Sequence, residues 1–355
     1  EIAQSYAGPL TLGLQGPIEP GRPLQPGRIA GSAKHFLADG GTADGRDQGD
    51  FIGTEQELID IHLSGYPQAI DAGVLSVMAS FSSWNGVKHS GNRSILTDVL
   101  RGPLGFEGFV VSDWNAHGQL PGCSNESCPD AVNAGIDMLM APDSWKPLYE
   151  NTLAQVRSGE ISMARVEEAV RRILRAKVKA GLFEDNRPLE GRLEHLGSAE
   201  HRALAREAVR KSLVLLKNEN ALLPLSRTAR IALIGPLLEA PMDAAGPWSI
   251  FADHARTIPL AEGFRRAVAD PAALSITPGC LPEASLPGGI EAAVAAAEAA
   301  EVVVLVLGET ALMSAEAQSR VTIDIPAPQQ ALAEAVVATG RPVVVVVKSG
   351  RGLEL

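Results

Sequence analysis

Four short apolar runs, each ending in polar side chains, organise the first half of the chain. The clearest is Phe109–Val111, which is followed at once by Ser112, Asp113 and Trp114. Runs of this length and β-branched content are typical of buried strands in a parallel sheet. Helical stretches follow the runs, and this alternation predicts a parallel sheet with helices outside it, either a barrel or a doubly wound fold. The other predicted strands are 28–36, 74–81 and 137–141, and the predicted helices are 54–72, 94–101, 129–134 and 162–181.

The second half of the chain repeats this alternation and predicts a second parallel α/β domain. We therefore expect a first domain at 1–185, a connecting region at 186–225 and a second domain at 226–355. Residues 1–27 are rich in Gly and Pro, so little regular structure is expected there beyond a short helical segment at the start. The predicted strands of the second domain are 230–234, 273–277, 302–307 and 342–348, and the predicted helices are 201–217, 290–300 and 327–339.

Two nucleotide-binding motifs are missing from this second domain. The turn after its first strand, Ile234–Leu237, lacks the Gly-x-Gly-x-x-Gly pattern that brings a backbone against a pyrophosphate. The chain also lacks Gly-x-x-x-x-Gly-Lys-Ser/Thr. Dinucleotide binding and nucleoside triphosphate hydrolysis are therefore disfavoured.

Composition and charge exclude other classes. The chain has 355 residues, of which 45% are hydrophobic and 21% charged, as in ordinary globular proteins. Its net charge is −11 and it has no basic block, so nucleic acid is not expected as a partner. The longest apolar run, Val343–Val347, has the length of a strand, and no membrane span is expected.

Three cysteines leave the redox environment open. Cys123 and Cys128 are close enough in sequence to form a disulfide, which would suit an oxidising compartment, or they are two free thiols in a surface loop. A zinc site is disfavoured because no second Cys or His pair lies nearby. Cys280 is expected to be a small buried apolar residue.

The polar residues at the predicted strand ends are the candidates for a functional site. In a βα-barrel all strands end at one rim, where active sites are built. Six side chains could share such a pocket: Lys34, His35, Asp39, Trp84, Asp113 and Trp114. Charged groups that bind hydroxyls, next to indole rings that stack on pyranose faces, suit a sugar. The alternative is structural, with Asp113 capping the next helix and Trp114 filling the rim.

Two carboxylates would be enough for glycoside hydrolysis. A retaining glycosidase needs a nucleophile and an acid/base about 5–5.5 Å apart. Asp113 is the candidate nucleophile. The loop after the predicted strand 302–307 offers Glu309 and Glu316 as candidate acids.

Several of these motifs together resemble glycoside hydrolase family 3, most closely its bacterial periplasmic β-glucosidases and exo-β-glucanases. The resemblance covers the whole chain. It implies an α/β chain made of the C-terminal half of a (β/α)8 TIM-like barrel and a partial α/β sandwich with a mainly parallel sheet. The motifs that carry it are Lys34–Phe36 with the following Gly/Asp loop, Ser80–Gly86, Gly108–Trp114, Ala205–Asn218, Trp248 and Arg320–Pro326.

The resemblance also implies residue roles. Asp113 is the nucleophile and Glu316 the acid/base that reaches the barrel from the second domain, with Glu309 as the second choice. Lys34 and His35 hold glucose hydroxyls in the −1 subsite, Asp39 supports their loop, Met78 and Phe81 line the pocket, and Trp114 and Trp248 sandwich the sugar at +1. A Tyr is common in the family at the position of Phe81. Trp248 could equally serve interface packing.

The implied activity is a retaining exo-β-glucosidase that removes terminal non-reducing β-D-glucosyl residues from β-glucosides and β-glucan oligosaccharides. The main alternative is a truncated, inactive carbohydrate-binding relic, because the first half of the family's barrel and the end of its second domain have no counterpart here. A phosphorylase would need a cationic or His acid/base, which Glu316 is not. The N-acetylglucosaminide-specific branch needs a loop His, and residues 37–50 contain none.

The remaining expectations follow from this chemistry. No metal or organic cofactor is expected, since two carboxylates suffice. The partner is a β-glucoside or β-glucan oligosaccharide, not nucleic acid or a membrane, and the oligomeric state is left open. A periplasmic or secreted location is expected, although this chain contains no leader.

Overall fold

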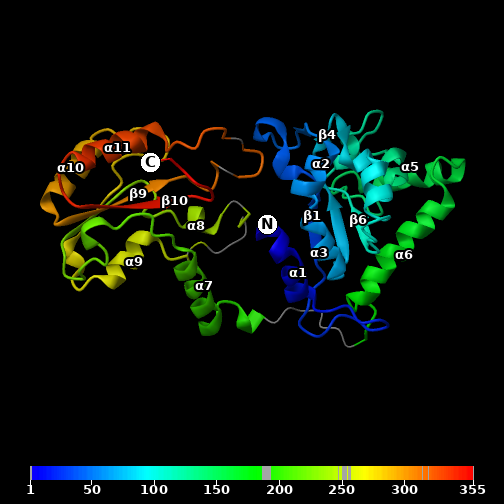
Figure 1. Cartoon of the computed structure of the whole chain (residues 1–355), viewed down its shortest axis with the longest axis horizontal. Helices are drawn as coiled ribbons and strands as arrows, with labels where there is room; N and C mark the ends of the chain where they lie inside the picture. Colours follow the sequence, from blue (N-terminus) through cyan, green and yellow to red (C-terminus); the bar gives the residue numbers. More distant parts are fainter. Residues whose placement is uncertain are drawn as a thin grey trace. The chain divides into compact units, whose positions relative to one another are not determined.

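The computed structural model describes residues 2–185, 193–246, 248–249, 254, 257–313, 315–318 and 320–354. The chain divides into two compact units, Glu1–Gly191 and Arg192–Leu355, and the two are described separately below (Figure 1). The boundary between the units falls inside the predicted connecting region 186–225.

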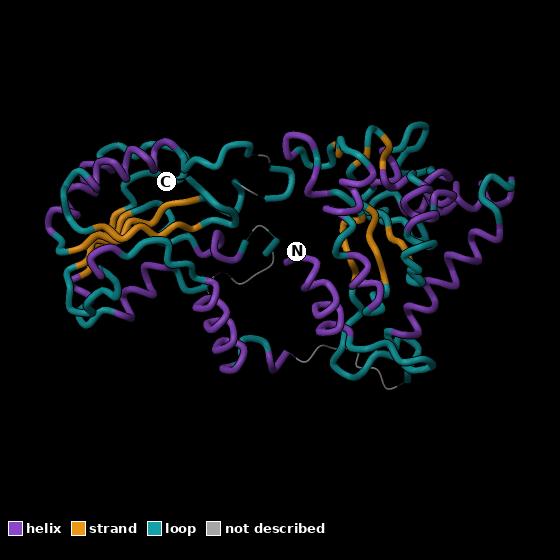
Figure 2. The backbone as a smooth tube through the Cα atoms, in the orientation of Figure 1, coloured by secondary structure: helices purple, strands orange, loops and turns teal. Residues whose placement is uncertain are grey.

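The first unit is built on a parallel sheet with strand order β1-β3-β6. Its strands are β1 (Ser32–Phe36), β3 (Ser76–Ala79) and β6 (Phe109–Val111), and Figure 2 shows them enclosed by helices and loops. The register pairs Val77 with Val110 and Met78 with Val111. The buried side chains of these strands form the core of this unit with those of the helices around them.

The predicted strand at 137–141 is wrong in extent, because only one parallel bridge forms there, between Val111 and Met138. Side-chain oxygens accept hydrogen bonds from backbone N–H groups that would bond to the neighbouring strand in a longer ladder. The carboxylate of Asp137 accepts the Val110 N–H at 2.8 Å, and Ser112 Oγ accepts the Met140 N–H at 2.9 Å. The chain still runs beside β6, so the loops after the two segments are neighbours.

Helices surround this sheet, and three of them differ from expectation. The helix α1 occupies a region predicted to be mostly irregular, α5 was not predicted, and the helix predicted at 54–72 is broken into three parts. Gln15 anchors the C-terminal end of α1, which contains Pro9: the buried amide binds Gly73 O at 2.6 Å and Gly31 N at 3.0 Å. The helices are α1 (Ile2–Gln15), α2 (Glu55–Glu57), α3 (Tyr66–Asp71), α4 (Pro129–Ala134), α5 (Trp145–Ser158) and α6 (Met163–Lys179), with π-helical turns η3 (Leu58–His62) and η5 (Ser94–Val99).

Shorter elements decorate the same unit. A small second sheet has the order β2-β4-β5. Its strands are β2 (Asp50–Phe51), β4 (Ser83–Trp84) and β5 (Val87–Lys88), and the 3-10 turns are η1 (Asp39–Gly41), η2 (Ala43–Gly45), η4 (His89–Gly91) and η6 (Ala116–Gln119).

The second unit is a four-stranded parallel sheet with the order β10-β9-β7-β8, and all four predicted strands are confirmed. The central strand β9 is buried along its whole length, as its apolar sequence predicts. Figure 1 shows α10 and α11 on one face of the sheet and α9 on the other. The strands are β7 (Ile231–Ile234), β8 (Leu274–Thr277), β9 (Val302–Gly308) and β10 (Val343–Lys348).

The helices of the second unit are α7 (Ala199–Ser212), α8 (Pro241–Ala245), α9 (Leu260–Ala267), α10 (Gly289–Ala299) and α11 (Ala327–Val337). Short turns are η7 (Leu193–His195), η8 (Glu219–Ala221) and η10 (Pro271–Ala273). The helix α7 ends at Ser212, before the predicted end at 217, because the backbone becomes extended at Leu213. The predicted α/β fold class is confirmed. Within the described residues, no helix has the length and apolarity needed to cross a membrane.

A buried ion cluster fixes the start of β6. The side chain of Asp137 is fully buried, and its two oxygens lie 2.6 Å from Arg101 Nη2 and 2.7 Å from Arg165 Nη2. Arg172 Nη1 is 3.5 Å away. One carboxylate thus joins α6, the segment after η5 and the backbone of the strand that leads to Asp113.

We expect Asp137→Asn to lower the free energy of unfolding by about 3–5 kcal/mol, because it leaves three guanidinium groups without their shared buried anion. Urea unfolding measures the effect. Glu168→Gln is the control, since Glu168 pairs with Arg172 at the surface and such pairs contribute about 1 kcal/mol or less. Equal losses in both variants would contradict the role given to Asp137.

Candidate active site

Asp113 lies two residues beyond the end of β6, on a loop. The side chains of Asp113 and Ser112 make hydrogen bonds within this loop. The Asp113 carboxylate accepts the Trp114 N–H at 2.7 Å, and Ser112 Oγ donates to the Asp113 backbone carbonyl at 2.9 Å. The side chain is 15% exposed, so a ligand can reach it. The structural alternative for this motif is not supported. Asn115, not Asp113, precedes the next helical turn, and Trp114 is 57% exposed.

The imidazole of His35 lies between two carboxylates. His35 Nδ1 is 3.3 Å from Asp39 Oδ2, and His35 Nε2 is 3.6 Å from Asp113 Oδ2. The hydrogen bond with His35 holds the pKa of Asp39 below its ordinary value of 3.8, and burial opposes this. Ser80 Oγ donates to Asp39 Oδ1 at 3.4 Å. The strand end therefore orients an imidazole toward the candidate nucleophile.

Three of the predicted sugar-binding residues, Lys34, His35 and Asp39, line a cavity of about 590 Å³ in the first unit. Residues of α1 and α3 form the opposite wall. The volume falls within the usual range for small-ligand sites. Asp113 is not among the lining residues, and its link to them is the 3.6 Å contact with His35.

Two further predicted residues flank this region. Met78 pairs in register with Val111, which places it on the strand next to the one that leads to Asp113. It is half-buried, and so is Phe81. Phe81 is held through its carbonyl, which accepts a hydrogen bond from Lys88 Nζ at 2.9 Å. Ser80, which precedes it, was not predicted to act at the site, although it belongs to the motif Ser80–Gly86.

Trp84 does not join the candidate pocket. Its indole Nε1 donates to Gly53 O at 2.9 Å, and its ring packs against the core of the first unit. It therefore has a structural role in the small sheet. Trp248 is 74% exposed on the second unit, between residues whose structure is not described.

The two candidate acids on the second unit differ sharply in environment. The side chain of Glu309 is 1% exposed and contacts Arg320, Arg351 and Ser349. The hydrogen bond from Arg351 holds the pKa of Glu309 below its ordinary value, with a smaller contribution from Ser349. A carboxyl kept ionised in this way is a poor proton donor. Glu316 lies in an exposed turn.

Two histidines are buried on the turns η6, which follows the loop of Asp113, and η4, which contacts η6. His117 Nε2 lies 3.0 Å from Asn125 O, while His89, on η4, is 0% exposed. Within the described part of the chain, neither ring nitrogen of His89 has a hydrogen-bond partner. Burial is the main cause that lowers the pKa of His89 to about 4.

This predicts an acid sensitivity with a defined sign. The unfolded chain binds a proton at His89 near pH 6.5 and the folded chain only near pH 4, so stability falls as the pH drops between these values. We expect this group to account for a loss of about 3 kcal/mol. Urea unfolding at several pH values measures it. In His89→Leu this part of the pH dependence should vanish, whereas an unchanged pH dependence would contradict the assignment.

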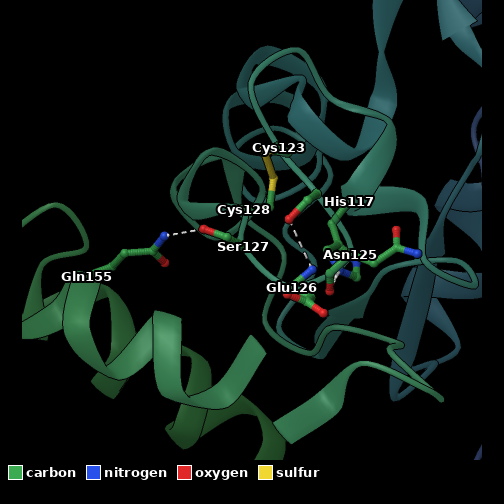
Figure 3. The surroundings of a disulfide bond; sticks show 8 residues. His117, Cys123, Asn125, Glu126, Ser127, Cys128 and Gln155 are labelled. Atoms are coloured by element: carbon green, nitrogen blue, oxygen red, sulfur yellow. Dashed lines mark hydrogen bonds between the residues drawn. A yellow bond between two sulfur atoms is a disulfide. The ribbon is translucent and has the colours of Figure 1, made fainter. Parts of the chain in front are cut away.

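The disulfide between Cys123 and Cys128 forms, so the alternative of two free thiols is wrong (Figure 3). It closes a loop whose carbonyl at Asn125 is the partner of His117. Cys280 is 1% exposed, as expected. Within the described residues, no group of three His, Cys, Asp or Glu side chains could hold a metal ion.

Comparison with known proteins gives a consistent result for both units. Residues 1–176 match the family model described as "Glycosyl hydrolase family 3 N terminal domain", and residues 213–355 match "Glycosyl hydrolase family 3 C-terminal domain". The periplasmic β-glucosidase of Salmonella typhimurium is 34% identical, over 91% of this chain and 46% of its own length. A β-xylosidase of Formosa agariphila is 30% identical, over 97% of this chain and 50% of its own length.

Solved structures agree with these matches. The exo-1,3/1,4-β-glucanase of a Pseudoalteromonas species is 39% identical with a TM-score of 0.85, and the match covers 100% of this chain and 44% of that one. The chain thus spans about half the length of the curated relatives it matches. Sequence models, relatives and fold agree, and the chain belongs to glycosyl hydrolase family 3.

Proposed function

We propose that this protein is a retaining exo-acting β-glucosidase that removes terminal non-reducing β-D-glucosyl residues from β-glucosides and β-glucan oligosaccharides. The observation that carries the proposal is the position of Asp113. Its carboxylate follows a buried parallel strand, is reachable at 15% exposure and lies 3.6 Å from His35. The names of the relatives, which include β-glucosidases and an exo-glucanase, support the reaction class.

In this proposal Asp113 attacks the anomeric carbon and forms a covalent glycosyl-enzyme, which water then hydrolyses. Lys34 and His35 bind sugar hydroxyls in the −1 subsite. Asp39 fixes His35 through the 3.3 Å contact with Nδ1. Met78 and Phe81 contribute apolar surface, and Trp114 and Trp248 stack on the sugar at +1.

Glu316 is proposed as the acid/base that protonates the leaving oxygen and later activates water. Its side chain is exposed, while the arginine contacts of Glu309 argue against the nearest alternative. A periplasmic or secreted location is proposed from the Salmonella relative and from the disulfide, which suits an oxidising compartment.

Proton NMR of the first sugar released from an aryl β-glucoside tests the proposal. Release of the β-anomer, at a rate independent of phosphate, is the expected result. First release of the α-anomer would contradict retention, and phosphate-dependent release of a sugar phosphate would indicate a phosphorylase. Binding of glucosides without any turnover would support the inactive relic. An aryl β-xyloside, tested in parallel, compares glucose with xylose at the −1 subsite.

A further inference from the structure

A large aromatic side chain with no assigned role lies at the same edge of the first unit as Asp113. Trp145 is the first residue of α5, and it is 58% exposed, as much as Trp114 at 57%. An exposed indole offers a broad, amphipathic face on which a ligand can stack. Lys146 Nζ lies 5.3 Å from the centroid of the Trp145 ring and restrains the ring by a cation–π contact.

Hydrogen bonds join the loop that bears Trp145 to the loop that bears Trp114. The parallel bridge between Val111 and Met138 aligns the two segments, so both continue past the same end of the sheet. Beyond it, Asn115 N donates to Met140 O at 2.9 Å. Ser112 Oγ accepts the Met140 N–H at 2.9 Å. The two indoles therefore belong to neighbouring loops of one rim.

The disulfide loop 123–128 holds these two loops together. One carbonyl, Asn125 O, has two partners: His117 Nε2 at 3.0 Å, four residues after Asp113, and Ser144 Oγ at 2.8 Å, one residue before Trp145. Figure 3 shows the loop lying between His117 and the helix that carries Gln155.

The same loop also makes hydrogen bonds with α5 further along the helix. Asn151 Nδ2 donates to Glu126 O at 2.9 Å, and Gln155 Nε2 donates to Ser127 Oγ at 2.9 Å. With the Ser144 contact, the disulfide loop is hydrogen-bonded to α5 and its N-terminal flank at three positions. A rigid aromatic surface binds with a smaller loss of conformational entropy than a mobile one.

We propose that Trp145, with Lys146, forms an outer acceptor subsite that binds a glucosyl unit of a β-glucan chain beyond the sugars next to the bond that is cleaved. The indole would stack on the apolar face of the pyranose, and the ammonium group would donate to its hydroxyls. This inference rests on the proposed function, because it assumes that a glucan chain lies along the rim from Asp113. In this proposal the disulfide loop holds the loops of Trp114 and Trp145 in fixed positions relative to each other.

Calorimetric titration with a β-linked glucose disaccharide and a tetrasaccharide tests the subsite without turnover. It is carried out with Asp113→Asn, which keeps the Oδ1 acceptor for Trp114 N. Adding Trp145→Ala is expected to weaken tetrasaccharide binding about tenfold relative to disaccharide binding, as the loss of one aromatic stacking contact implies. Trp145→Phe should restore part of the difference.

The control is Phe183→Ala, which removes a side chain that is 62% exposed. Phe183 follows α6, whose Arg175 contacts the carbonyl of Glu107 before β6, so it lies toward the opposite edge of the sheet. This control should leave both affinities unchanged. Equal weakening of both sugars by Trp145→Ala, or no weakening of either, would overturn the subsite. If the unmodified protein binds both sugars but hydrolyses neither, the proposed function fails while the subsite is still decided by these affinities.

Discussion

Asp113→Asn should reduce the hydrolysis of aryl β-glucosides by at least about 10⁴-fold, because an amide cannot form the glycosyl-enzyme. The fold should be unaffected, since the asparagine side chain keeps the oxygen that accepts the Trp114 N–H at 2.7 Å. Steady-state kinetics measure the loss, and urea unfolding confirms that the variant is folded. Sugar binding should persist, because Lys34 and His35 remain.

Asp143→Asn is the matched control for this substitution. Asp143 is exposed in the neighbouring loop of the same unit. Its replacement should leave kcat/KM within about twofold of the unmodified protein, as for most surface substitutions. Comparable losses of kcat/KM in both variants would show that the loss comes from a general change of charge and not from removal of a nucleophile. Retained activity in Asp113→Asn would contradict the assignment directly.

Glu316→Gln should slow the hydrolysis of glucosides with poor leaving groups by about 10²–10⁴-fold, the usual contribution of a general acid. Glucosides with strongly acidic leaving groups, which need no proton, should react at their first step almost as before. A series of aryl glucosides of graded leaving-group pKa measures this dependence.

Glu309→Gln is the comparison that separates the two candidate acids. Glu309 is bound by Arg320 and Arg351, so its loss should lower stability without changing the leaving-group dependence. If Glu309→Gln steepens that dependence and Glu316→Gln does not, the roles assigned to the two residues are reversed.

Much of the architecture could be predicted from the periodicity of the sequence. The buried run Val302–Gly308 and the other strands of the second unit formed as expected, because long apolar runs leave few alternatives. The segment 137–141 could not be predicted as well, since side chains of Asp137 and Ser112 accept backbone hydrogen bonds there in place of a neighbouring strand. Likewise, α1 is anchored by Gln15, which reaches Gly73 across 58 positions, a contact that local sequence does not reveal.

The candidate site, too, could be predicted from the sequence only in part. The position of Asp113 at a strand end followed from its motif, and the contact with His35 agrees with the expectation that strand ends meet. Trp84 looked equivalent to Trp114 in sequence, yet its indole is engaged by Gly53 O. The exposed Trp145 escaped prediction because α5 itself did. That it shares a rim with Trp114 follows only from tertiary hydrogen bonds, those of Met140 with the Trp114 loop and those of the disulfide loop.

Intact-mass spectrometry after incubation with a 2-deoxy-2-fluoro-β-glucoside that carries a good leaving group tests the central claim most directly. The fluorine slows breakdown of the glycosyl-enzyme, so a working nucleophile stays labelled. The account predicts one adduct per chain, located by peptide mapping on Asp113 and absent from Asp113→Asn. An adduct on another residue, or no adduct in a preparation that hydrolyses β-glucosides, would contradict Asp113 as the nucleophile.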